Sequence, residues 1–312
     1  MKYAFIFPGQ GSQTIGMGKD FYDNFDPAKE LFEKASDILQ IDMKKLCFEQ
    51  SDLIHQTQFT QPAIFLVSMV AHAILQQESP LLAHLALGHS LGEISAVCVA
   101  YGMSFEDGIA LTHQRGKLMH EACEGRDAGM MVIVGCEDGA LEEFCAGMRE
   151  EGKSIWCANY NGEGQMVLAG LKKDLTEAES HIKALGSKRA LLLPISTASH
   201  CPLLESMSAK FQALLQPILA ANFSLPVISN ATTDAYSTRP DALQALSHQL
   251  TSPVLYKQSI QKIDPEIDGY IEFGNGNVLK GLNKRLSTKE TLSISDTASL
   301  KEALAKLQEG RI

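Results

Sequence analysis

The sequence lacks the features that usually identify secreted, membrane-spanning, metal-binding and nucleic-acid-binding proteins. Its seven cysteines are scattered and none forms a Cys-x-x-Cys pair, so neither a zinc site nor a disulfide framework is expected. No apolar stretch approaches the roughly 20 residues of a membrane span, and the first apolar run is too short for a signal peptide. The net charge of −10 argues against nucleic acid as the main partner. We therefore expect a cytoplasmic protein that needs no metal.

What the chain does have is the pattern of an α/β protein. Short apolar runs that predict buried strands alternate with segments of helical spacing. This alternation predicts an α/β fold whose large subdomain has a parallel-sheet core, similar to that of the α/β-hydrolases. The core strands are expected at residues 3–7, 83–87, 226–230 and 269–274, the last of these being the final core strand. A covering helix is expected over residues 27–47 and a buried helix over residues 63–75.

The segment Gly88-His89-Ser90-Leu91-Gly92 is the feature around which the chain is organised. It follows a predicted strand and precedes a helical pattern, which is the context of the nucleophile elbow of serine enzymes. Glycines at 88 and 92 leave room for the strand and the helix, and the serine hydroxyl is exposed on the turn. The helix N-terminus favours negative charge. Ser90 is therefore placed to attack a carbonyl, although so short a motif can also match by chance.

The turn after the first strand, Pro8 to Gln13, allows two interpretations. Gly9 and Gly11 could open a dinucleotide-binding fingerprint, but that motif requires a further glycine where this chain has Thr14. The turn could instead leave a backbone N–H free to face a ligand, because glycines permit a close backbone approach. We favour the second interpretation.

Arg115 lies on the inward face of a helix predicted to begin after Ser104 and to run to about Cys123. A guanidinium on this face must meet an anion, because an unpaired buried charge is costly. The anion could be an Asp or Glu elsewhere in the chain. It could also be a carboxylate of the substrate, held by two hydrogen bonds. Periodicity alone favours the first alternative.

The middle of the chain predicts a small inserted subdomain. Strands and helices follow one another as βαββαβ, which is typical of the ferredoxin-like unit. We place this subdomain at residues 127–194, and the catalytic subdomain at residues 1–126 and 195–312.

A serine nucleophile needs a base, which is most often histidine. His200 follows a strand and precedes a helix, where a loop can project over a sheet edge, whereas His248 lies within a helix. We favour His200. No Asp or Glu between Ser90 and His200 stands clearly at the end of a core strand, so a backbone or amide carbonyl could orient the imidazole instead.

Taken together, these segments resemble the malonyl-CoA:acyl carrier protein transacylases, the malonyl-loading enzymes of fatty acid synthesis. The resemblance covers essentially the whole chain. It rests on ordered motifs at residues 7–13, 60–63, 88–93, 114–117, 159–161, 199–200, 249 with 253–254, and 279–282.

The resemblance implies a role for each matching residue. Ser90 would carry the acyl group, and His200 would act as general base and acid. The backbone N–H groups of Gln10 and Leu91 would form the oxyanion hole, and the backbone carbonyl of Gln249 would orient His200. The resemblance also assigns Arg115 to the free carboxylate of the malonyl group, against the preference from periodicity. Further residues are expected to line the cleft: Asn159, Asn161 and Met119.

The implied reaction moves malonyl from malonyl-CoA to the phosphopantetheine thiol of acyl carrier protein, without a cofactor. Carrier proteins are generally acidic, so local basic patches are expected at Lys188-Arg189 and at Lys280 with Lys284-Arg285. A monomer is expected, with no nucleic acid and no membrane as partner. The alternatives are a free-standing acyltransferase of a polyketide assembly line, a serine acyl hydrolase or thioesterase, and a non-enzymatic binding module.

Three segments depart from the family pattern. Asn275 stands where the family usually has proline between two glycines, Ser196-Thr197-Ala198 precedes the histidine, and Gly162-Glu163 replaces Ser-Pro. These departures concern loop geometry and acyl preference rather than the reaction.

Overall fold

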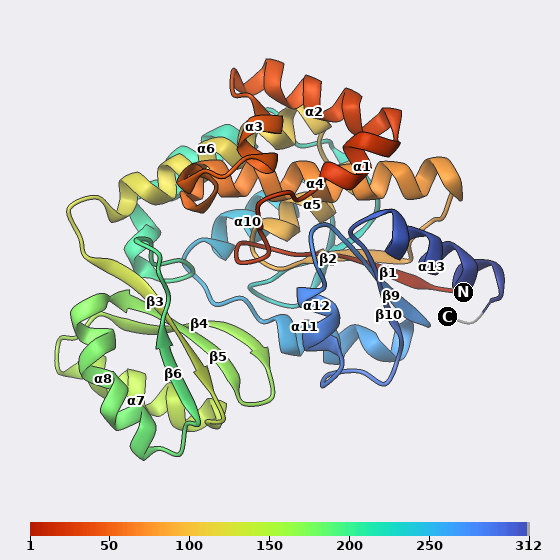
Figure 1. Ribbon diagram of the computed structural model, residues 1–312. Coiled ribbons are helices and arrows are strands. Elements are labelled where there is room, and N and C mark those ends of the chain that lie inside the picture. Colours follow the sequence, from red (N-terminus) through yellow and green to blue (C-terminus); the bar gives the residue numbers. More distant parts are fainter. Residues whose placement is uncertain (311–312) are drawn as a thin grey trace.

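The computed structural model describes residues 1–310, which form two β-sheets with helices packed against them (Figure 1). The strands of the large sheet are β1 (Tyr3–Phe7), β2 (Leu85–Gly88), β7 (Asn222–Ile228), β8 (Ala235–Thr238), β9 (Gly269–Phe273) and β10 (Thr291–Ile294). Their order in the sheet is β10-β9-β1-β2-β7-β8. All neighbours pair in parallel except β8, which is antiparallel to β7. The parallel-sheet core is confirmed, but β9 is not the last core strand, because β10 pairs beyond it.

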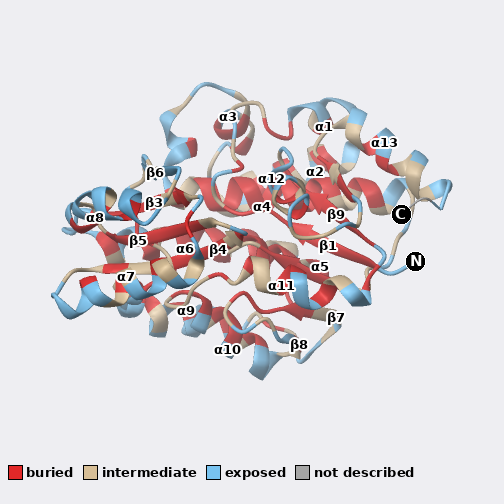
Figure 2. Ribbon diagram, turned by 90° about the horizontal axis from the view of Figure 1, so that it is seen from below, coloured by how far each residue is buried: buried red, intermediate tan, exposed pale blue. Residues whose placement is uncertain are grey.

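Side chains of β1 alternate between the two faces of the large sheet, as the two-residue period of a strand requires. Phe5 and Phe7 join the core under α4 (Thr57–Glu78), α5 (Leu91–Val99) and α6 (Phe105–Cys123). Ala4 and Ile6 join the opposite core, under α11 (Tyr256–Ile263) and α12 (Val278–Asn283). The sheet is therefore buried on both faces, which explains why its strands are continuous apolar runs. Figure 2 shows this buried interior along β1, β9 and α4.

Helix α4 begins six residues before the predicted Ala63, so Pro62 lies inside it. Proline has no N–H to donate to the carbonyl of Gln58, four residues earlier. The ring nitrogen Nδ1 of His113 on α6 lies 2.7 Å from that carbonyl and takes the vacant place. By length and composition α4 could cross a membrane, but 78% of its most apolar window is buried inside the fold. It is the core helix between α2 (Asp26–Leu39), α5 and α6.

The predicted covering helix over 27–47 is wrong as a single element. Gln40 adopts a left-handed conformation (φ 55°) and ends α2, and α3 (Met43–Phe48) follows with Asp42 as its cap. The remaining helical segments cover the surface or connect the strands: α1 (Lys19–Asn24), η1 (Asp52–His55), η2 (Pro202–Met207), α9 (Ser208–Leu215), α10 (Arg239–Gln249), η3 (Asp264–Glu266) and α13 (Thr297–Gln308).

The small sheet consists of β3 (Ala128–Val134), β4 (Ile155–Gly162), β5 (Gln165–Leu171) and β6 (Arg189–Leu192). It is antiparallel in the order β4-β5-β3-β6. This is the strand order of the ferredoxin-like unit, which confirms the predicted βαββαβ fold. Helices α7 (Asp138–Glu150) and α8 (Lys172–Ala184) cover one face of this sheet (Figure 1).

Strand β4 also joins the small sheet to the segment that leads into α11, which packs against the large sheet. Its backbone pairs with Val254, just before α11: Tyr160 N–H donates to the Val254 carbonyl (2.8 Å), and Val254 N–H donates to the Ala158 carbonyl (2.8 Å). An ion pair between Lys257 on α11 and Asp138 on α7, both largely buried, reinforces this contact. The small sheet is therefore held in place against α11 and the segment before it.

Candidate active site

The turn between β2 and α5 is too tightly packed for side chains at its glycines. A Cβ added to Gly88 would lie 1.9 Å from the carbonyl carbon of Gly92, and one added to Gly92 would lie 2.0 Å from the carbonyl oxygen of Phe7. Helix α5 thus rests directly on the ends of β1 and β2. The sequence motif and the geometry agree: this is a strand, a sharp turn and a helix.

Ser90 sits at this turn with a positive φ of 55°, which is unusual for a residue other than glycine. Two side chains hold its backbone in place. Ser90 N–H donates to Asn230 Oδ1 (2.7 Å), and the Ser90 carbonyl accepts from Gln249 Nε2 (2.9 Å). Asn230 lies just after β7 and Gln249 ends α10, so two segments from later in the chain hold the strained turn.

His200 faces the serine hydroxyl. Its Nε2 lies 2.7 Å from Ser90 Oγ, and its Nδ1 lies 2.8 Å from the backbone carbonyl of Gln249. A carbonyl can only accept, so Nδ1 carries the proton and Nε2 is the acceptor for the serine O–H. Burial and the nearby Arg115 lower the pKa of His200 to about 3, so the imidazole is a neutral base. The competing candidate His248 is exposed on α10.

Arg115 is 1% exposed and lies beside the serine. Its Nη1 donates to Gln61 Oε1 (2.8 Å), while its Nη2 donates to Gln249 Oε1 (2.9 Å) and lies 3.3 Å from Ser90 Oγ. Its Nε has no partner among residues 1–310, and none of their Asp or Glu residues forms an ion pair with the guanidinium. Burial lowers the pKa of Arg115 to about 10, so it remains a cation at neutral pH. The protein therefore surrounds this charge with amides, and the alternative of a direct internal ion pair is wrong.

Two backbone N–H groups near Ser90 are free to bind an anion. Gln10 follows β1 in the glycine-rich turn, and Leu91 is the first residue of α5, where N–H groups have no acceptor within the helix. Within the described chain neither N–H has a protein acceptor. Both residues line the same cavity as Ser90.

This cavity has a volume of about 710 Å³ and lies between the two sheets. The large-sheet side contributes Ser90, His200, Arg115 and Met119. The small-sheet side contributes apolar and amide side chains: Met130, Val132, Asn159, Asn161 and Val167. Asn161 Oδ1 accepts a hydrogen bond from His89 Nε2 (2.7 Å), which links the two sides across the cavity. All the predicted site residues except Gln249 line it, and Gln249 lies behind Ser90 and His200.

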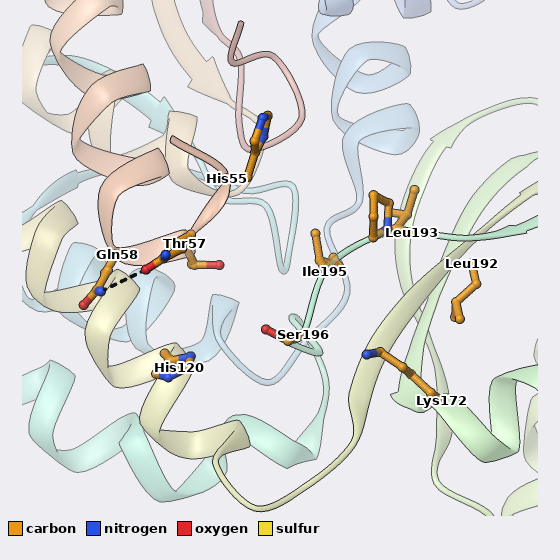
Figure 3. A pocket seen from close by; sticks show the side chains of 11 residues that line it. His55, Thr57, Gln58, His120, Lys172, Leu192, Leu193, Ile195 and Ser196 are labelled. Carbon is orange, nitrogen blue, oxygen red and sulfur yellow. Dashed lines mark hydrogen bonds between the residues drawn. The ribbon is translucent and has the colours of Figure 1, made fainter. Parts of the chain in front are cut away.

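A second hollow of about 520 Å³ adjoins the first and shares His55 and residues 193–195 with it. Figure 3 shows that it lies between the start of α4, the segment after β6 and Lys172 at the start of α8. The cleft therefore continues beyond the serine along the junction of the two sheets. Within residues 1–310, no group of three or more His, Cys, Asp or Glu side chains is arranged to hold a metal ion.

Comparison with known proteins gives the same family at the level of sequence and of structure. A family model for the acyl transferase domain matches residues 4–289. The malonyl CoA-acyl carrier protein transacylase of Bacillus subtilis strain 168 is 36% identical over 313 aligned residues, which cover 99% of this chain and 98% of the relative. The chain belongs to the malonyl CoA-acyl carrier protein transacylase family.

Solved structures of transacylases have the same fold. The crystal structure of malonyl-CoA:acyl carrier protein transacylase from Helicobacter pylori matches with a TM-score of 0.95 and 48% identity, over 99% of each chain. A malonyl-transacylase in complex with a type II PKS acyl-carrier protein matches with a TM-score of 0.94 and 34% identity, over 98% of this chain and 100% of that one.

In this transacylase, Asn275 has a clear structural place although it departs from the family pattern. Its side-chain amide donates to the Ser12 carbonyl (2.6 Å) and to Thr14 Oγ1 (2.9 Å). It thus ties the loop after β9 to the turn that carries Gln10. These side-chain hydrogen bonds hold the loop in place at the position where the family usually has a proline.

Sequence reasoning missed three residues of the site: Gln61, Asn230 and Glu93. Gln61 and Glu93 lie in segments that the family resemblance had matched, but no role followed from the resemblance. Asn230 ends the predicted strand 226–230, and a polar residue at the carboxyl end of a parallel strand is a signal that could have found it.

Proposed function

We propose that this protein transfers a malonyl group from malonyl-CoA to the phosphopantetheine thiol of acyl carrier protein, through a malonyl-serine intermediate. The observation that carries the proposal is Arg115: a buried cation with no carboxylate partner among residues 1–310, 3.3 Å from the serine oxygen. A malonyl group on Ser90 would bring its free carboxylate to the unpartnered Nε of Arg115 and to Nη2. A neutral acyl chain would leave that charge unpaired.

The first half-reaction acylates the serine. His200 Nε2 takes the Ser90 proton while Oγ attacks the thioester carbonyl carbon. The N–H groups of Gln10 and Leu91 stabilise the resulting oxyanion. As the C–S bond breaks, His200 returns the proton to the sulfur, and coenzyme A leaves as the free thiol.

The second half-reaction runs in the reverse sense with a different thiol. The carrier's phosphopantetheine thiol gives its proton to His200, and the sulfur attacks the ester carbonyl. The C–O bond to Ser90 then breaks, and Oγ recovers the proton from His200. The malonyl group leaves as a thioester of the carrier protein, so one serine alternates between two thiols.

The carrier would approach through exposed basic side chains. Lys188, Arg189, Lys284 and Arg285 are exposed, and Lys280 is partly exposed. None of the five has an ion-pair partner in the portion of the chain that the structure describes. We assign these five side chains to binding of the acidic carrier protein.

The proposed enzyme is a cytoplasmic monomer that acts without a cofactor. Within it, residues 127–194 would form the inserted subdomain, and residues 1–126 and 195–312 the catalytic one, of which residues 311–312 lie outside the described part of the chain.

The likeness to a transacylase in complex with a type II PKS acyl-carrier protein supports a second candidate carrier. A polyketide carrier would be loaded by the same chemistry. Competition between fatty acid and polyketide carriers for one pool of malonyl-enzyme would identify the better acceptor by its kcat/KM.

Initial-rate kinetics with malonyl-CoA and the phosphopantetheinylated carrier test the proposal. A ping-pong mechanism gives parallel double-reciprocal lines, and isolated malonyl-enzyme should load the carrier in a single turnover. Reversing the charges of Lys284 and Arg285 should raise the KM for the carrier and leave that for malonyl-CoA unchanged. Release of free malonate at the same rate with and without carrier would instead identify a hydrolase.

A further inference from the structure

Behind the serine lies a buried carboxylate that the reaction scheme does not use. Glu93 on α5 is fully buried and accepts three hydrogen bonds. The donors are Asn230 N–H (3.0 Å), the Tyr236 hydroxyl (2.9 Å) and Gln249 Nε2 (2.7 Å). Burial raises the pKa of Glu93 to about 7, while the hydrogen bonds from these three donors and the nearby Arg115 lower it. Glu93 is linked to Arg115 through the side chain of Gln249 and does not contact the guanidinium directly.

The side-chain amide of Gln249 lies between the Glu93 carboxyl group and the Arg115 guanidinium. Its Nε2 donates to Glu93 Oε2 and to the Ser90 carbonyl, and its Oε1 accepts from Arg115 Nη2 (2.9 Å). An amide turned the other way would place N–H groups against the donors of Arg115 and an oxygen against the carboxylate. Glu93, together with the Ser90 carbonyl, thus favours the orientation in which the amide oxygen faces the arginine.

This arrangement leaves the arginine free for a substrate. A carboxylate in direct contact with Arg115 would satisfy the guanidinium internally and compete with an acyl group for it. An amide contact holds the guanidinium in place and leaves its Nε without a partner. Glu93 therefore acts on Arg115 only indirectly, through the side-chain amide of Gln249.

We propose that Glu93 is a positioning residue for acyl selection, which fixes the Gln249 amide so that Arg115 presents its free N–H groups to the acyl carboxylate. The proposal rests on the proposed function, since it assigns Arg115 to the malonyl carboxylate. Glu93 touches neither the acyl group nor the reacting atoms, and its effect passes through Gln249.

The test compares malonyl with acetyl loading in single preparations of Glu93→Met and Glu93→Gln. Because both rates come from one sample, their ratio does not depend on the fraction of protein that is folded. In Glu93→Met the amide keeps the Ser90 carbonyl but loses its other close acceptor, and the malonyl-to-acetyl ratio should fall by up to about tenfold, the upper value of one hydrogen bond. Glu93→Gln keeps an acceptor for Gln249 and should restore most of the ratio. Tyr236→Phe, which removes a hydrogen bond on the far side of Glu93, should leave the ratio unchanged.

An unchanged ratio in Glu93→Met would overturn the proposal, even if both rates fell together. A crystal structure of Glu93→Met supplies a readout that does not depend on malonyl transfer. The amide of Gln249 should turn or move away from Arg115 Nη2, and an amide that keeps its 2.9 Å contact would refute the positioning role. Failure of the wild-type protein to prefer malonyl would count against the proposed function, while the crystal structure would still decide the role of Glu93.

Discussion

The two sides of the catalytic cavity are built from different kinds of residue. On the large-sheet side, Ser90, His200, Arg115 and Gln249 form one connected set of hydrogen bonds. On the small-sheet side, the cavity is lined by Met130, Val132 and Val167, together with the amides of Asn159 and Asn161. The large-sheet side therefore holds hydrogen-bond donors, acceptors and a charge at fixed distances, whereas the small-sheet side presents mostly apolar surface.

The difference indicates a division of work. Bond making needs groups held to within a fraction of an ångström, and the parallel sheet with its short βα turn supplies that rigidity. The small sheet contributes apolar side chains to the wall of the cavity, and its pairing with Val254 fixes the position of β4. Substitutions on the two sides should therefore differ in size and in kind.

The largest effect is expected for His200→Ala on the large-sheet side. Without its base the serine hydroxyl is a weak nucleophile, and malonyl-serine formation should slow by about 10⁴-fold. Rapid-quench measurement of the acylation rate would show this, with circular dichroism as the folding control. A loss of less than tenfold would mean that another group activates Ser90.

Arg115→Ala should change selectivity as well as rate. Two hydrogen bonds to the malonyl carboxylate would be lost, so malonyl loading should fall by roughly 10²–10³-fold while acetyl loading improves. Arg115→Lys is the matched control, because it keeps the charge but not the two-pronged geometry. Equal losses with malonyl-CoA and acetyl-CoA would contradict the assignment of Arg115 to the carboxylate.

The pH dependence should reflect the buried setting of His200. The imidazole must be neutral to act as base, and its pKa is lowered to about 3, so acylation should persist well below the ordinary midpoint of 6.5. In Arg115→Ala the nearby cation is gone, the pKa of His200 rises, and the acid limb should move to higher pH. Acetyl-CoA is the suitable donor, since it has no carboxylate to bind. A wild-type midpoint near 6.5 would contradict this picture.

Val132→Ala on the small-sheet side should have the smallest effect. It enlarges the cavity without touching a hydrogen bond of the serine, so the change in malonyl loading should stay within about tenfold. Longer acyl groups should gain relative to malonyl, which a panel of acyl-CoA donors would measure. A loss as large as that of His200→Ala would show that the small sheet takes part in the chemistry itself.

Local patterns were enough to predict much of this molecule. The nucleophile elbow, the inward face that carries Arg115 and the βαββαβ succession of elements in the middle of the chain all follow from short-range spacing. The break at Gln40 did not, because neither glycine nor proline marks it. The short strands β8 and β10 carry too little pattern of their own and are defined by the strands beside them.

The site's supporting network was beyond local pattern for a physical reason. Gln249 reaches Glu93 across 156 residues of sequence, and Asn230 reaches Ser90 across 140. Such contacts exist only once the sheet has formed. The family resemblance pointed to the carbonyl of Gln249 but not to its side chain, which connects Ser90, Glu93 and Arg115.

The central claim is that Ser90 carries malonyl because Arg115 holds its carboxylate. Its most direct test is the intact mass of the protein after incubation with malonyl-CoA in the absence of carrier. The expected result is a stable gain of one malonyl group that is absent in Ser90→Ala. Persistence of the adduct in Ser90→Ala, or rapid release of malonate from the wild-type protein without any adduct, would contradict the claim.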